Sequence, residues 1–358
     1  MSTTLDAMSA RTIDPKLKAA AAKIPSFIVS ADSHVDEPYD LWDGMPADLR
    51  EDFPKRTVYA KDKRPAGGMD PKARITDMNL DGVAAEVLYP TYTLRLFARS
   101  QAVQERAFRI YNDWVADYCR IAPKRLFAIP AICVYDIDAA VKELQRCHDL
   151  GLIGGLVWQV PDPKLPVTST HYERLWAAAA ELGAPINFHI LTGHNYKMSV
   201  KHRGMEKIRG SVNIKTADAV TTVFDLIWSG VFERHPKLKT VIVEAEIGWM
   251  PFALQQWDYY YKRNKKPGHP QEDFLIDRLP SEIFNEHIYA TFMDDEIGSY
   301  ILNKWGERNC MWSSDYPHPN MTWPNSRAFL AKQIGDLEPA KQKRVLSQNV
   351  IDLYRLPI

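Results

Sequence analysis

Short apolar runs alternate with longer segments of helical periodicity along most of the chain. The runs are rich in Val, Ile and aromatic residues, which is typical of buried strands. This pattern predicts eight strands, at residues 27–34, 84–89, 126–133, 155–159, 185–190, 240–246, 288–292 and 310–314. It predicts helices between and after them, at residues 101–121, 137–150, 171–182, 217–231, 249–263, 296–305, 325–334 and 339–354.

Eight alternations of strand and helix predict an α/β fold of the (β/α)8 barrel type, which needs about 250 residues. The surplus residues are predicted to form lid-like insertions after strands one, five and six, at 35–82, 191–213 and 264–286. The first insertion is rich in Pro, Asp, Lys and Arg and shows little periodicity, so we expect an extended loop over the barrel mouth. One domain is predicted for residues 26–358, preceded by an N-terminal arm at 1–25.

Composition excludes several classes of partner. The 358 residues include 45 basic and 45 acidic side chains, so the formal net charge is zero. Nucleic acid or an anionic membrane surface as partner would favour a basic excess, and no apolar run approaches the roughly 20 residues of a membrane span. The N-terminus lacks the apolar block of a secretory signal, and the four cysteines form no C-x-x-C pair. A cytoplasmic location is therefore predicted.

The stretch SADSHVDEP, residues 30–38, ends the first predicted strand. Side chains alternate along a strand, so Asp32 and His34 share a face at its C-terminal end, where barrel active sites are built. A carboxylate and an imidazole at this spacing can form half of a metal site, although the same residues also occur in plain turns. Asp36 and Glu37 lie beyond the strand and are expected to shape the loop.

Further ligand-type side chains end strands five and eight. His189 stands in INFHI, where a lone histidine also fits a buried core position, and His194 follows on a glycine-containing loop. Asp315 follows the apolar run of strand eight, and a buried carboxylate there is costly unless it is paired or ligating. In a barrel these groups converge with Asp32 and His34.

Strand six places two carboxylates among apolar neighbours. The pattern TVIVEAEIG puts Glu244 and Glu246 on one face, where both would enter the barrel mouth together. Close like charges raise the pKa of one carboxyl group and make it a candidate proton carrier. The competing interpretation is that both pair with Lys or Arg at the rim, which fits Glu246 better than Glu244.

Three motifs carry a resemblance to a known family. ADSHVDEP after strand one, RHPKLKTVIVEAEIGWMPF around strand six and MWSSDYPHPNMTWP at strand eight resemble the amidohydrolase-related, metal-dependent family that includes aminocarboxymuconate-semialdehyde and gamma-resorcylate decarboxylases. The resemblance spans residues 28–353 and is strongest in SDYPH. It implies a barrel that holds one divalent metal through Asp32, His34, His189 and Asp315.

The sequence departs from the family pattern at two positions. Strand one has Asp32 where His or Glu is usual; zinc is the first expectation for the metal, and manganese or magnesium are alternatives because aspartate is a hard ligand. Decarboxylating relatives resemble GHMGE on strand six, whereas this chain reads VEAEIG and has no histidine there. Glu244 is expected to replace it, although a one-residue shift of the alignment would give Ala245 instead.

Two reactions follow from this site. In the first, Glu244, Asp315 or His194 protonates the carbon of a small aromatic or enol carboxylate that loses CO₂. In the second, Asp315 takes a proton from a metal-activated water that attacks an amide, ester or lactone. Decarboxylation is favoured narrowly. A barrel that has lost its metal and serves only in assembly is the least favoured reading.

Three more residues are assigned around this centre. Arg64 in the first insertion and Tyr92 after strand two are predicted to bind the substrate carboxylate and ring. His318, three residues beyond Asp315, is predicted to hydrogen-bond that ligand from outside, with surface exposure after Pro317 as the alternative. The N-terminal arm and the apolar C-terminus predict a homodimer.

Overall fold

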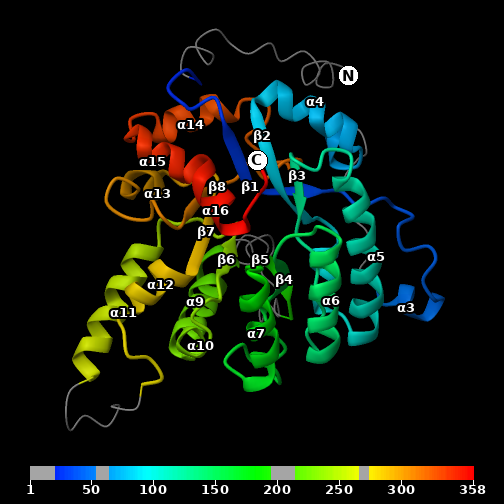
Figure 1. Cartoon of the computed structure of the whole chain (residues 1–358), viewed down its shortest axis with the longest axis horizontal. Coiled ribbons are helices and arrows are strands. Elements are labelled where there is room, and N and C mark those ends of the chain that lie inside the picture. Colours follow the sequence, from blue (N-terminus) through cyan, green and yellow to red (C-terminus); the bar gives the residue numbers. More distant parts are fainter. Residues whose placement is uncertain (1–20, 54–63, 195–213, 266–273) are drawn as a thin grey trace, which may run out of the picture.

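The computed structural model describes residues 21–53, 64–194, 214–265 and 274–358. Eight parallel strands form its centre, with helices around them (Figure 1). The strands are β1 (Ile28–Val35), β2 (Val83–Pro90), β3 (Leu126–Ala128), β4 (Gly155–Val160), β5 (Ile186–Gly193), β6 (Thr240–Val243), β7 (Ile288–Phe292) and β8 (Cys310–Trp312). Each predicted strand is present, although β3, β6 and β8 end earlier than predicted.

Helices connect successive strands and close the chain. Those between strands are α3 (Ala47–Glu51), α4 (Pro71–Asp81), α5 (Gln101–Cys119), α6 (Ile137–Asp149), α7 (Glu173–Leu182), α9 (Ala219–Trp228), α10 (Val231–Arg234), α11 (Met250–Asn264), α12 (Pro280–His287) and α13 (Glu296–Ile301). After β8 come α14 (Ser326–Ile334), α15 (Pro339–Lys343) and α16 (Asn349–Tyr354). Short helical turns are η2 (Ala66–Gly68), η3 (Thr93–Ala98), η4 (Thr170–Tyr172), η5 (Ile214–Asp218) and η6 (Arg344–Gln348). None of the helices within the described ranges is long and apolar enough to cross a membrane.

Two hydrogen-bonded seams join the strands into a barrel. Regular pairing links β1 to β2 and β3, and β4 through to β8. Between β3 and β4, the backbone N–H of Ile132 donates to Leu156 O at 2.9 Å, and Leu156 N–H donates to Pro130 O at 2.8 Å. On the other side, Asp315 N–H donates to Asp32 O at 3.1 Å. Closure brings the ends of β1 and β8 side by side, as the (β/α)8 prediction requires.

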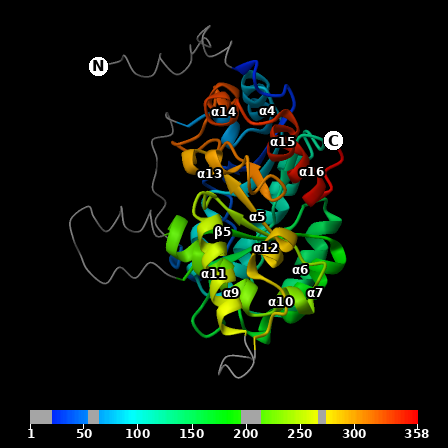
Figure 2. The same cartoon turned by 90° about the vertical axis from the view of Figure 1, so that its left-hand side faces the viewer.

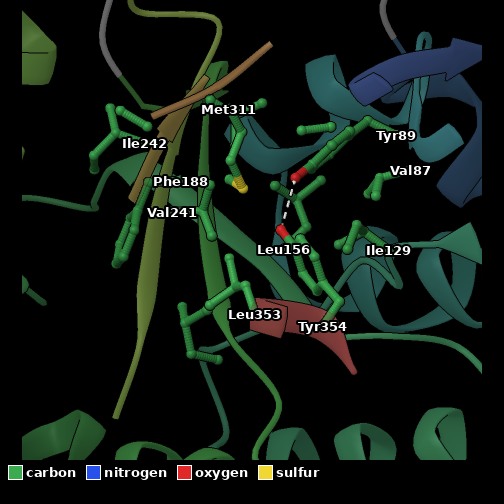
Figure 3. Packing of buried hydrophobic residues seen from close by; sticks show 14 of the residues in the cluster. Val87, Tyr89, Ile129, Leu156, Phe188, Val241, Ile242, Met311, Leu353 and Tyr354 are labelled. Atoms are coloured by element: carbon green, nitrogen blue, oxygen red, sulfur yellow. Dashed lines mark hydrogen bonds between the residues drawn. The ribbon is translucent and has the colours of Figure 1, made fainter. Parts of the chain in front are cut away.

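The interior of the barrel is filled by side chains. Val87, Leu156 and Met311 of the strands face inward together with Ile129, the residue after β3, and Leu353 and Tyr354 of α16 reach in toward them (Figure 3). Both Tyr354 and Tyr89 donate their hydroxyl hydrogens to Asn187 Oδ1, at 2.6 and 2.8 Å. The C-terminal helix therefore closes one end of a packed barrel, which leaves the C-terminal ends of the strands for chemistry.

The first insertion departs from its prediction. Instead of an extended loop, its described part contains α3, η2 and the eleven-residue helix α4. Asp70 caps α4 by accepting the Lys72 N–H at 2.8 Å, and Gly82 ends it with a φ of +79°, which favours glycine. The third insertion likewise contains α12. Residues 1–20 of the predicted arm and 195–213 of the second insertion lie outside the described residues.

Asp81 at the end of α4 joins this helix to α14. Both helices lie at the same end of the molecule in the two overall views (Figures 1 and 2). The Asp81 carboxyl is buried and accepts hydrogen bonds from the Ser326 backbone N–H, at 2.8 Å, and from the Ser326 hydroxyl. Burial raises the pKa of Asp81 to about 7. The folded protein therefore holds this proton at pH values where the unfolded chain has released it.

This proton should make folding stability depend on pH. A raised folded-state pKa contributes stability that is present at low pH and lost as the pH rises from about 4 toward 7. An Asp81→Asn protein should keep both contacts with Ser326 without that dependence, and its advantage over the wild type should grow by about 2 to 3 kcal/mol between pH 5 and pH 8. Denaturant titration at both pH values measures it; an equal pH response in both proteins would contradict the assignment.

Candidate metal centre

Side chains from the C-terminal ends of four strands meet at one point. Candidate ligand atoms of Asp32, His34, His189 and Glu244 all lie within 4.8 Å of one another; Asp32, His34 and His189 are fully buried, and the Glu244 side chain is 11% exposed. A second group with the same spacing shares His34 and adds Asp315 and His318. The described part of the structure therefore brings together every residue predicted as a ligand, with Glu244 beside them.

The separations are those of groups around a common centre. His34 Nε2 lies 3.4 Å from Asp32 Oδ1 and 3.4 Å from Asp315 Oδ1. His189 Nε2 lies 3.8 Å from Asp32 Oδ1 and 3.7 Å from Glu244 Oε2. Distances of 3.7 to 3.8 Å exceed those of hydrogen bonds. These atoms face one another closely without bonding directly.

Several polar atoms at this point have no hydrogen-bond partner among the described residues. They are both carboxylate oxygens of Asp32, Nε2 of His34, Nε2 of His189 and Oδ2 of Asp315. An unpartnered buried polar atom is rare because it loses its hydration without compensation. A single cation would satisfy all of them, and carboxylate oxygens with imidazole nitrogens suit a divalent metal. The residues present therefore fit the predicted ion.

Both histidines are oriented as metal ligands. The Nδ1 atom of His34 lies 2.9 Å from Pro90 O, and that of His189 lies 2.7 Å from Ile190 O. A carbonyl oxygen can only accept, so each Nδ1 carries the hydrogen and each Nε2 presents its lone pair to the centre. Burial also lowers the pKa of His34 well below its usual value, so its ring is neutral as metal binding requires.

The Asp32 carboxylate is fully buried and neither of its oxygens has a hydrogen-bond partner among the described residues, so a nearby positive charge would stabilise its ionised form. Burial raises the pKa of this carboxyl, because the charged form is poorly solvated inside the barrel. The β1–β2 register shifts between Ser30 and Ser33, and the Ser33 hydroxyl lies 3.0 Å from Ser30 Oγ and 2.9 Å from Ser314 Oγ. These serines tie the end of β1 to the segment after β8. Serine in a strand carries no distinctive signal, so this role of the serines was not predictable from the sequence.

Glu244 reaches the centre by a route that the sequence analysis did not predict. Strand β6 ends at Val243, and Glu244 and Glu246 adopt left-handed φ values of +62° and +57°. The predicted alternation through 246 is therefore wrong, and only Glu244 faces His189. Glu246 instead accepts the Met293 N–H at 3.1 Å. Such a conformation costs about 1 to 3 kcal/mol in a non-glycine residue and is concentrated at functional sites.

Asp315 is also left-handed, with a φ of +53°. His318 lies behind it, with Nδ1 at 2.7 Å from Asp315 Oδ1 and Nε2 at 3.1 Å from Thr91 Oγ1. The His318 ring lies tilted by 31° against that of His34, with 4.0 Å between centroids, and its side chain is 15% exposed. The structure thus places His318 against the Asp315 carboxylate rather than on the surface.

The other predicted site residues lie around the cluster. His194 is hydrogen-bonded to the Tyr135 hydroxyl at 2.8 Å and lies 3.8 Å from Asp162. It belongs to neither of the two ligand groups found among the described residues. Arg64 forms an ion pair with Asp36. Burial is the largest influence on the pKa of His318 and lowers it, but the nearby carboxylates of Asp315 and Glu244 together raise this pKa above its usual value. Arg64 opposes the protonated ring, so it lies within electrostatic reach of His318.

Tyr92 packs in an aromatic group, with its ring centroid 5.4 Å from Trp42 and 6.4 Å from Phe53. Its backbone N–H donates to the buried Glu37 carboxylate at 2.8 Å, and Thr93 N–H donates to the same carboxylate at 2.8 Å. Glu37 therefore shapes the turn after β2 and holds Tyr92 at the barrel mouth.

Comparisons with known proteins agree with the resemblance that the sequence motifs carry. A family model described as amidohydrolase matches residues 34–356. Gamma-resorcylate decarboxylase of Rhizobium radiobacter is 26% identical over 253 residues, which cover 68% of this chain and 75% of that protein.

Two solved structures share the fold. The 5-carboxyvanillate decarboxylase of Sphingomonas paucimobilis matches with a TM-score of 0.72 at 20% identity, covering 93% of this chain and 100% of the other. A dihydroxybenzoic acid decarboxylase of Polaromonas sp. JS666, solved with bound manganese and the inhibitor 2-nitroresorcinol, matches with a TM-score of 0.67 at 19% identity, covering 92% and 97%.

Proposed function

The chain belongs to the amidohydrolase family, as its motifs predicted, and we propose that it is a divalent-metal-dependent decarboxylase of a small aromatic carboxylate. The observation that carries the proposal is the convergence of five buried, unpartnered ligand atoms from Asp32, His34, His189 and Asp315. Relatives named as gamma-resorcylate decarboxylases, and neighbours solved as decarboxylases of hydroxylated benzoates, support the substrate class.

Asp32, His34, His189 and Asp315 would hold the ion, and Glu244 would face the substrate. When bound, a divalent cation stabilises negative charge that develops on the substrate oxygens. The donor set of carboxylates and imidazoles suits both zinc, the expectation from the sequence, and manganese, which a structural neighbour binds. Metal analysis of protein purified without chelators distinguishes the two.

In the proposed reaction Glu244 delivers a proton to the ring carbon that carries the carboxylate. The bond to the carboxylate then breaks, CO₂ leaves, and the bonding electrons restore the ring. The Glu244 side chain is 11% exposed, so it can regain a proton from solvent after each turnover. Asp315 and His194 are the alternative proton carriers. His318 supports Asp315 through its hydrogen bond.

Hydrolysis of an amide, ester or lactone is the second candidate. The observation that favours it is the carboxylate of Glu244 at a position where decarboxylating relatives are expected to have histidine, because a carboxylate suits a general base for water. Incubating the metal-loaded protein with hydroxybenzoates, enol acids, amides and lactones separates the two reactions. CO₂ release from a hydroxybenzoate supports the proposal, whereas acid release from an amide or lactone without CO₂ replaces it with hydrolysis.

Arg64→Ala should raise KM about tenfold and change kcat much less. A guanidinium binds carboxylates in a two-point geometry, and Arg64 lies beside Asp36 within reach of His318. Steady-state kinetics on the best substrate measures both constants. Arg174→Ala is the matched control, because Arg174 forms an exposed ion pair with Asp138 outside the barrel. An unchanged KM for the Arg64 variant would remove Arg64 from the pocket.

Tyr92 is proposed to contact the substrate ring from the aromatic group that it forms with Trp42. The homodimer and the cytoplasmic location remain predictions from the sequence.

A further inference from the structure

Arg74 on α4 is a fully buried arginine outside the predicted site. Its side chain has no exposed area. Burying a guanidinium is costly unless it is paired and hydrogen-bonded, and replacing such a group by an apolar residue is often neutral for stability. A buried arginine in an insertion therefore calls for a role beyond holding the helix.

The guanidinium of Arg74 joins α4 to three parts of the barrel. Its Nε donates to Glu86 Oε2 of β2 at 2.6 Å, and its Nη1 donates to the backbone oxygen of His34 at 2.6 Å. Its Cζ lies 4.8 Å from the ring centroid of Tyr316, a cation–π distance. The Tyr316 hydroxyl in turn donates to Asp77 on α4.

These contacts reach one proposed metal ligand, His34, and the residue that follows another. His34 accepts from Arg74 through its carbonyl group, and its N–H donates to Tyr316 O at 2.6 Å. Tyr316 follows Asp315 directly in the sequence. Arg74 thus touches one ligand residue and the immediate neighbour of another, at the point where β1 meets the segment after β8.

We propose that Arg74 is a positioning residue that sets the relative placement of His34 and Asp315, an inference that rests on the proposed metal centre. The Nε and Nη1 atoms of the planar guanidinium bind Glu86 and the His34 carbonyl group at the same time. The face of the guanidinium packs against the Tyr316 ring. Both ligands are then held with little freedom to separate. Metal sites depend on such supporting contacts because ligand distances must be met within about 0.2 Å.

Arg74→Lys tests the role of the planar guanidinium and its several N–H donors. Lysine keeps the charge and can pair with Glu86, but its single ammonium lacks the planar geometry that serves Glu86, His34 and Tyr316 together. We expect the Kd for Mn²⁺ or Zn²⁺, measured by competition with a chelating dye on metal-stripped protein, to rise about 10- to 100-fold. The visible spectrum of the Co²⁺-loaded protein should also change, while thermal unfolding stays within a few degrees of wild type.

Arg125→Lys is the matched control. Arg125 donates to the backbone oxygens of Ala84 and Val83, at 2.8 and 2.9 Å, at the N-terminal end of β2, away from the proposed metal centre. Replacing Arg125 removes a similar pair of hydrogen bonds to the backbone, but Arg125 contacts none of the proposed metal ligands. The metal affinity should therefore be unchanged. The proposal is overturned if Arg74→Lys binds metal as the wild type does, or if Arg125→Lys weakens binding equally.

A double variant covers the case in which Arg74→Lys fails to fold. Arg74→Met with Glu86→Gln leaves no uncompensated charge in the interior and should fold. It should show the same loss of metal affinity, and wild-type affinity in this folded protein would overturn the proposal. Because affinity is measured without turnover, wild-type protein that binds metal but releases no CO₂ would refute the proposed reaction while leaving the role of Arg74 intact.

Discussion

His189→Ala is expected to abolish stoichiometric metal binding and to lower decarboxylation by at least about 10³-fold, because a bound cation contributes several kcal/mol to the transition state. His189 Nε2 is a buried atom without a hydrogen-bond partner in the described structure, and its Nδ1 is fixed by the Ile190 carbonyl group. Alanine leaves the remaining ligands unable to enclose the ion. Elemental analysis and CO₂ release on the same preparation measure both effects.

His235→Ala is the control for this variant. The His235 ring pairs with Glu173 at 2.7 Å on the outside of the barrel. Its removal should leave metal content and activity near those of wild type. A His189→Ala protein that still holds one equivalent of metal would show that His189 is a buried core histidine, the alternative that its position in INFHI leaves open.

Glu244→Gln is expected to lower kcat by about 10²- to 10⁴-fold, the usual range for the loss of a general acid or base, while metal content stays near one equivalent. Glutamine keeps the size and the hydrogen-bonding oxygen of the side chain but cannot transfer a proton. Glu244 N–H donates to Thr291 Oγ1 at 2.8 Å, and this backbone contact should survive the change. Kinetics and metal analysis are run together.

Glu246→Gln provides the comparison for Glu244→Gln. Glu246 shares the left-handed conformation and lies two residues away, but its carboxylate accepts from the Met293 backbone, which glutamine can also do. We expect wild-type kcat for this variant. If Glu244→Gln instead loses metal in proportion to activity, Glu244 is a ligand, and Asp315 or His194 must carry the proton.

The barrel was predictable because its strands are apolar runs with turns at both ends. Strand β7, Ile288–Phe292, has the predicted bounds. Strand β6 does not, because the chain becomes left-handed at Glu244, where Thr291 of the next strand accepts its N–H. That contact forms only in the assembled sheet. Local alternation cannot reveal it, so the sequence placed Glu244 and Glu246 on one face although only Glu244 lies beside His189.

Helix α4 was missed because its buried face is charged. The buried residues of this helix are Arg74, Met78 and Asp81, which leave no apolar stripe for periodicity to detect. Its ends did carry signals, since Asp70 before Pro71 and Gly82 after the last turn match the usual helix boundaries. Charged residues could pack here because Glu86 and Ser326, distant in sequence, supply their partners.

The convergence of the candidate ligand residues was predictable for a different reason. A barrel places every strand end on one rim, so polar residues that directly follow apolar runs must converge there. This rule does not extend into loops. His194 lies beyond Gly193, the last residue of β5, and contacts Tyr135 and Asp162 instead of the cluster. Arg74 could not be found this way, because it acts through the backbone of His34 rather than from a strand end.

The most direct measurement of the central claim is CO₂ release from carboxyl-¹³C-labelled gamma-resorcylate as metal is titrated into stripped protein. We expect ¹³CO₂ to appear at a rate that rises with bound Mn²⁺ or Zn²⁺ and levels off at one equivalent per chain. The same labelled carboxylate should stay intact without metal. Failure of the fully loaded protein to release ¹³CO₂ from gamma-resorcylate and from 5-carboxyvanillate, together with acid release from an amide or lactone, would contradict the account.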